Sequence, residues 1–146
     1  FRSTGHSGAG KSTMSGLLAG RGADVLSDER IIVRQRGDEF FLYGTPWVGE
    51  SQFALNRSGP LTRLFCIRHG ERRHELNSMT SMAASQFLLQ QCFLPHWDPE
   101  AMQGVLSTIG DLVERIDCVK LAFLKDASVA DFLMQPAATT ETVGAA

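Results

Sequence analysis

A short run near the start of the chain carries the residue types and spacing that bind phosphate. Residues 5–13 read Gly-His-Ser-Gly-Ala-Gly-Lys-Ser-Thr, a complete G-x-x-x-x-G-K-[ST] phosphate loop. Glycines let backbone N–H groups approach a phosphate chain, Lys11 can reach the β- and γ-phosphates, and Ser12 can ligate Mg²⁺. The motif therefore predicts binding of ATP and Mg²⁺. The residues expected to contact the nucleotide are Gly5, His6, Ser7, Gly8, Ala9, Gly10, Lys11, Ser12 and Thr13.

The residues that follow the loop predict a helix that would hold it. Met14, Leu17 and Leu18 have helical spacing, and Gly20 and Gly22 can end a helix of about two to three turns. The positive end of this helix's dipole would face the bound phosphates. We expect the loop to act through its backbone, so that the histidine within it is a spacer facing solvent.

An acidic pair follows the predicted helix at a spacing that can return it to the loop. The apolar run 23–27 predicts a buried strand, and Asp28 and Glu29 stand at its carboxyl end, where α/β folds place ligand chemistry. Asp28 is the candidate catalytic acid, which would take the proton of an attacking hydroxyl or hold a metal-bound water. Ser12, Asp28 and Glu29 are the candidate metal ligands. A solvated turn acid is the alternative for Asp28, and a structural role is the alternative for Glu29.

The rest of the chain alternates between strand and helix patterns. The sequence predicts a β-hairpin around Gly37-Asp38, a second hairpin with a turn at His69-Gly70, and two helices with apolar stripes. Ser78 or Thr80 would cap the first of these helices, and Asp98 the second. The expected strands are 31–36, 39–43, 61–68, 71–76 and 118–124, the helices run from about 80 to 93 and from 99 onward, and 128–133 is a short amphipathic turn.

The composition indicates one α/β domain. The chain has 146 residues, of which 43% are hydrophobic, and a net charge of -2. Residues 1–134 would form the domain, and 135–146 would be a disordered tail because periodicity is lost there. The charge suggests no nucleic-acid partner, and no stretch has the length of a membrane span or the regions of a signal peptide. A cytoplasmic protein is expected, and a homo-oligomer is left open.

Two further groups of residues have competing interpretations. Cys66, His69 and His74 resemble part of a zinc site, but they offer too few soft ligands and straddle a predicted hairpin, so a surface hairpin is preferred. An arginine cluster on the same hairpin can bind phosphate or an acidic peptide, although a solvated face is the favoured interpretation. Its members are Arg63, Arg68, Arg72 and Arg73.

The phosphate loop, the helix ending near Gly20 and the acidic pair together resemble the HPr serine kinase/phosphorylase family. Residues 43–50, Tyr-Gly-Thr-Pro-Trp-Val-Gly-Glu, are similar to the corresponding segment of HPr-kinase-like proteins. The resemblance implies a P-loop kinase core of the type shared with ATP-dependent phosphoenolpyruvate carboxykinases, a mixed sheet with flanking helices. It also implies phosphoryl transfer from ATP to a serine or threonine hydroxyl of a protein or peptide, with Lys11 and Asp28 as catalytic residues.

The chain departs from the family pattern at three points. The second acid is Glu29 where the family has Asp, the family's Arg-Gly-x-Gly segment is absent, and the strands that should precede the loop are missing. A nucleotide-binding module that regulates, or that has lost catalysis, is therefore the alternative function. A different phosphate-loop NTPase would need a lid or a base-specificity motif, and neither is found. Trp47 and Glu50 are the candidate substrate contacts, with packing of the loop onto the core as the alternative for Trp47.

Overall fold

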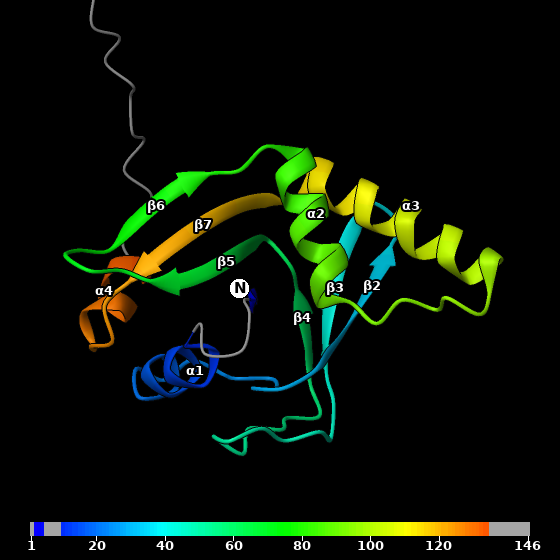
Figure 1. Cartoon of the computed structure of the whole chain (residues 1–146). Coiled ribbons are helices and arrows are strands. Elements are labelled where there is room, and N and C mark those ends of the chain that lie inside the picture. The colour runs from blue at the N-terminus through cyan, green and yellow to red at the C-terminus, as the bar shows by residue number, and fades with distance from the viewer. Residues whose placement is uncertain (1, 5–9, 135–146) are drawn as a thin grey trace, which may run out of the picture.

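The computed structural model describes residues 2–4 and 10–134 and shows a mixed α/β fold with two sheets and flanking helices (Figure 1). The larger sheet has the strand order β1-β5-β7-β6, and the smaller sheet has the order β2-β3-β4. The strands are β1 (Arg2–Thr4), β2 (Ile31–Arg36), β3 (Glu39–Gly44), β4 (Ser58–Pro60), β5 (Arg63–His69), β6 (Glu75–Ser78) and β7 (Asp117–Phe123). The helices are α1 (Lys11–Ala19), α2 (Ser81–Gln91), α3 (Pro99–Arg115) and α4 (Ser128–Met134).

The larger sheet is built on three parallel strands, β1, β5 and β7. Residues 64–67 of β5 are all buried and apolar, as expected of a parallel strand that is covered on both faces. Residues 2–4 lack such a composition, yet they form β1, which pairs in parallel with β5 directly before the phosphate loop. The expectation that no strand would stand before the loop was therefore wrong for these residues.

The predicted hairpin between 61–68 and 71–76 is wrong in its pairing. Both segments contain strands, but β6 pairs antiparallel with β7, and β7 lies between β5 and β6. Since β7 has five buried apolar residues and β5 has four, inserting β7 between the two segments buries more apolar surface than a β5–β6 pair would. The exposed residues of β6 then occupy the edge.

The predicted strand over residues 23–27 is also wrong. The segment makes an isolated bridge between Ser27 and Ala54. Its other backbone contacts are hydrogen bonds from the N–H of Ala23 to the carbonyl of Leu18 and from the N–H of Leu55 to the carbonyl of Leu26. The hydroxyl of Ser27 accepts from the N–H groups of Glu29 and Arg30, which offers the local backbone an alternative to a sheet ladder. Asp28 therefore follows an irregular segment and does not stand at the end of a strand.

Sequence signals predicted several of the other elements correctly, whereas the short strand β4 was not expected. The hairpin of β2 and β3 turns at Gly37, which has a φ of 60°. The hydroxyl of Thr80 caps α2, and the carboxylate of Asp98 accepts from two N–H groups of α3. Helix α1 ends where predicted, with Gly22 at a φ of 85°.

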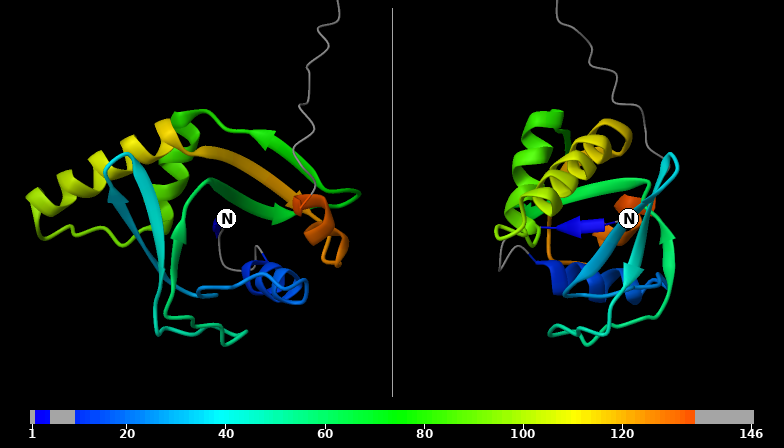
Figure 2. Two further views of the ribbon diagram at one scale, coloured as in Figure 1. Left: turned by 180° about the vertical axis from the view of Figure 1, so that it is seen from behind. Right: turned by 90° about the vertical axis from the view of Figure 1, so that its right-hand side faces the viewer.

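Two hydrophobic clusters hold the layers together. One joins β3 and the amino ends of β5 and β7 to α2 and α3, and includes Phe40 and Leu112. The other packs α1 and α4 against the carboxyl halves of β5 and β7, and includes Met14 and Phe123. The views in Figure 2 show α1 and α4 at the opposite end of the larger sheet from α3. No helix among the described residues is long and apolar enough to cross a membrane.

Candidate functional site

The end of the phosphate loop lies at the carboxyl ends of two parallel strands. Gly10 has a φ of 92°, and a Cβ added there would stand 2.7 Å from the ring of Phe123 and 2.8 Å from that of His69. His69 is the last residue of β5 and Phe123 the last of β7. Only glycine fits this position, for reasons of both conformation and space. Residues 5–9, which include Gly5, His6, Ser7, Gly8 and Ala9, lie outside the described residues.

Helix α1 begins at Lys11 without a side-chain cap or an acidic residue in its first turn. Its first N–H groups are among those that an α-helix leaves without partners inside itself. The other long helices receive an oxygen from their own sequence, Thr80 for α2 and Asp98 for α3. The start of α1 thus has the composition of a helix end that receives an anion from outside. Lys11 and Ser12 are half-buried there, and Thr13 is exposed.

Asp28 is buried and bound by the backbone of the segment between β3 and β4, residues 45–57, called here the β3–β4 loop. The residue is 6% exposed. Its Oδ1 accepts from the N–H of Gly49 at 2.9 Å, and its Oδ2 from the N–H of Ser51 at 2.7 Å. Such charge-assisted bonds are roughly twice as strong as neutral ones. Each carboxylate oxygen thus uses one of its two lone pairs in these bonds to described residues.

Ser51 connects Asp28 to the start of α1. Its N–H donates to Asp28, and its hydroxyl donates to the carbonyl of Ser12 at 3.3 Å. Ser27 fixes the same loop from the other side, since its hydroxyl donates to the carbonyl of Trp47. The structure therefore links Asp28 to the backbone of Ser12 through Ser51. The roles of Ser12 and Asp28 at a metal or a reacting group stay predictions.

Glu29 faces a different region from Asp28. It lines a cavity of about 730 Å³ between β2 and the two helices α2 and α3, together with Arg30, whose Nε lies 3.9 Å from the Glu29 carboxylate. The Arg30 guanidinium stands 4.8 Å from the ring of Phe93 and 5.8 Å from that of Trp47. Glu29 is exposed and is not gathered with Ser12 and Asp28.

The side chains predicted to contact substrate are exposed. Trp47 is 54% exposed, and Glu50 is also exposed, because the β3–β4 loop is fixed through its backbone. The indole of Trp47 is therefore available as a platform, and it does not plug the core. Ser27 and Ser51, which hold this loop, were not found from the sequence, because a serine that binds backbone looks like any other loop serine.

The four arginines of the cluster do not lie together in the structure, and Cys66, His69 and His74 do not form a metal site. Arg63 begins β5 and pairs with Asp117, whereas Arg68, Arg72 and Arg73 lie at the other end of that strand. Cys66 is buried, and burial raises the pKa of its thiol to about 12. Within residues 2–4 and 10–134, no three His, Cys, Asp or Glu side chains are grouped to hold a metal ion.

Comparison with protein-family models, with curated proteins and with solved structures found no match to this chain.

Proposed function

We propose that this chain binds ATP with Mg²⁺ through residues 5–13 and transfers the γ-phosphoryl group to a serine or threonine hydroxyl of a protein or peptide. The observation that carries the proposal is the placement of Gly10 and the uncapped start of α1, both within a complete phosphate-loop sequence, at the carboxyl ends of β5 and β7. Ligands of open α/β sheets bind at this edge. The resemblance to HPr-kinase-like proteins supplies the acceptor class.

In the proposed reaction the chain's own residues position and neutralise charge. Lys11 contacts the β- and γ-phosphates and offsets the charge on the transferred group. The hydroxyl of Ser12 would hold Mg²⁺, which would supply further positive charge there. The acceptor oxygen forms the new bond to phosphorus as the bond to the β–γ bridging oxygen breaks and ADP leaves. The hydroxyl proton passes to the carboxylate of Asp28, each oxygen of which accepts one hydrogen bond from the described residues.

One observation favours a second function, a module that binds nucleotide without transferring phosphate. Both oxygens of Asp28 already accept from the backbone, and the residue is 6% exposed. These contacts give Asp28 a sufficient role as the anchor of the β3–β4 loop. In this alternative, nucleotide binding would set the position of that loop through Ser51, which contacts both Asp28 and the start of α1.

Radiolabelled ATP separates the two functions. Both predict saturable, Mg²⁺-dependent binding that is weakened in Lys11→Ala. Only the kinase predicts transfer of label to serine or threonine in a library of peptides or in a protein acceptor, and transfer must be lost in Lys11→Ala. Binding with no transfer, under conditions where a known kinase labels the same library, would favour the second function. Absence of nucleotide binding would reject both.

A further inference from the structure

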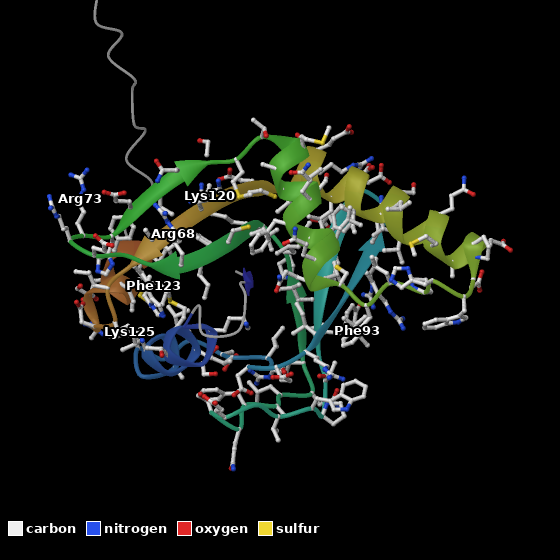
Figure 3. All side chains as sticks on the ribbon, viewed as in Figure 1. Arg68, Arg73, Phe93, Lys120, Phe123 and Lys125 are labelled. Carbon is white, nitrogen blue, oxygen red and sulfur yellow. The ribbon has the colours of Figure 1, made fainter. Side chains whose placement is uncertain are left out.

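A polar cavity lies beside the phosphate loop at the turn between β5 and β6. Its volume is about 350 Å³, and His69, which contacts the space beside Gly10, forms part of its wall. Figure 3 shows Arg68 and Arg73 at the same end of the larger sheet as Phe123 and Lys125. The charged and titratable residues in its lining are Arg68, His69, Glu71, Arg72, Arg73 and Glu75.

The cations of this cavity are only partly neutralised. The Nε of Arg73 binds the Glu75 carboxylate at 2.8 Å, and the pKa of Glu75 is lowered first by that hydrogen bond. Among the described residues, neither Arg68 nor Arg72 forms an ion pair. The lining carries three arginines against the two carboxylates of Glu71 and Glu75, which leaves an excess of one positive charge with His69 neutral.

The turn that carries these arginines is held in place at both ends. The N–H of Gly70 donates to the carbonyl of Phe123 at 2.8 Å, and a Cβ on Gly70 would stand 2.9 Å from the carbonyl oxygen of Arg73. At the other end, the Nδ1 of His74 accepts from the N–H of Leu124 at 3.2 Å. These contacts fix the backbone of the turn against the end of β7, and so beside Gly10.

We propose that this cavity binds an acidic side chain of the peptide acceptor through Arg68 and Arg72. The inference rests on the proposed kinase function, because it places the acidic side chain beside the hydroxyl that receives phosphate. Guanidinium groups bind carboxylates with two parallel hydrogen bonds. The volume suits one or two acidic side chains, and it is near the lower limit for a ligand pocket.

Binding can be measured without ATP, using the full chain and two fluorescein-labelled peptides. One has a serine flanked by glutamates, and the other has glutamines in their place. We expect the glutamate peptide to bind more tightly, and Arg68→Gln or Arg72→Gln to weaken it about tenfold, in keeping with the loss of one charge-assisted hydrogen bond. Arg34→Gln is the matched control, because Arg34 is exposed on β2 and also lacks an ion pair among the described residues.

Three results would overturn the inference. The first is equal affinity for the two peptides, and the second is a loss of glutamate-peptide affinity in Arg34→Gln as large as in the Arg68 and Arg72 variants. The third is binding of inorganic phosphate that depends on Arg72 while the glutamate peptide does not bind. The last would assign the cavity to a small anion. Thermal unfolding of each variant shows whether a loss of binding reflects loss of folding.

Kinetics separate failure of this inference from failure of the proposed function. If the peptide is phosphorylated, Arg72→Gln should raise KM for the glutamate peptide about tenfold and leave kcat unchanged. Peptide binding that needs Arg68 and Arg72 but gives no phosphorylation would keep the cavity assignment and reject the kinase. Phosphorylation whose KM is the same in wild type, Arg68→Gln and Arg72→Gln would support the kinase function and reject the cavity assignment.

Discussion

The start of α1 and the β3–β4 loop both present backbone N–H groups, but within the described part of the chain a carboxylate binds those of the loop alone. Gly49 and Ser51 donate to Asp28, which is buried between them and the preceding segment. The first turn of α1 has no acidic residue and no side-chain cap. A binding site needs donors that the fold leaves available, whereas a structural anchor needs donors that are already satisfied.

This difference changes how the acidic pair is interpreted. In the sequence, Asp28 stood out as a catalytic acid because of its distance from Lys11. In the structure it is also the anchor of a loop that touches Ser12. Experiments that disturb the two regions separately can therefore distinguish an acid that performs chemistry from one that only holds the loop.

The largest effect is expected at Asp28. If this residue accepts the proton, Asp28→Asn should lower phosphoryl transfer by about a hundredfold or more, within the range of general acid–base effects, while ATP still binds. Ser27→Ala is the matched control, because it loosens the same loop without removing the carboxylate. Initial rates with radiolabelled ATP measure both. Equal losses in the two variants would show that Asp28 acts only by holding the loop.

The next effect tests whether α1 is fixed where the site needs it. Gly10→Ala should lower the free energy of unfolding by about 2 kcal/mol or more, because a left-handed conformation and contact with two rings both oppose a methyl group. Gly37→Ala has the conformational cost alone, since nothing lies within 4 Å of its added Cβ, and should cost about 1 kcal/mol. Urea unfolding of both variants checks this. Equal costs would mean that Gly10 is not packed against β5 and β7.

Lys11 tests the charge at the start of α1. Lys11→Ala should weaken ATP binding about tenfold or more, since it removes a charge-assisted contact to phosphate. Lys120→Ala is the control, because it removes the same charge at a place away from α1. The neighbours of Lys120 in β7, Val119 and Leu121, pack in the cluster that contains α1, whereas Lys120 alternates with them and is exposed. Calorimetric titration should find wild-type affinity in the control. Unchanged affinity in Lys11→Ala would remove the phosphate loop from the proposal.

Thiol labelling gives the smallest but most local readout. Cys92 is exposed, whereas Cys66 is buried in β5 with its pKa raised to about 12, so only the former should react readily in the folded chain. Asp28→Asn should leave Cys66 protected, because the disturbed loop is not part of the larger sheet. Rapid labelling of Cys66 in that variant would mean that the two regions unfold together.

The raised pKa of the Cys66 thiol predicts that the folded chain becomes less stable in alkali. An unfolded cysteine ionises near pH 9.0, while burial keeps the Cys66 thiol protonated in the folded chain to about pH 12. The folded state then binds more protons than the unfolded state, so the free energy of unfolding falls as pH rises through this interval. Cys66→Ser should reduce that dependence in urea titrations between pH 8 and pH 11. An unaltered dependence would assign it to other groups.

Local sequence signals determined the elements whose stability is decided by nearby residues. The caps Thr80 and Asp98, the turn at Gly37 and the end of α1 at Gly22 were all readable because capping and turn geometry involve residues a few positions apart. The phosphate-loop motif was readable for the same reason. What it binds remains a prediction from the sequence.

Only the tertiary structure decided which strands pair and what Asp28 touches. Strand β5 pairs with β7 and not with β6, its neighbour in the sequence. The two apolar strands β5 and β7 bury more apolar surface together than β5 and β6 would. Asp28 found Gly49 and Ser51, more than twenty residues away, because a buried carboxylate requires donors wherever the fold can bring them. Contacts of this kind depend on which surfaces the whole chain can bury at once, and no local pattern encodes that choice.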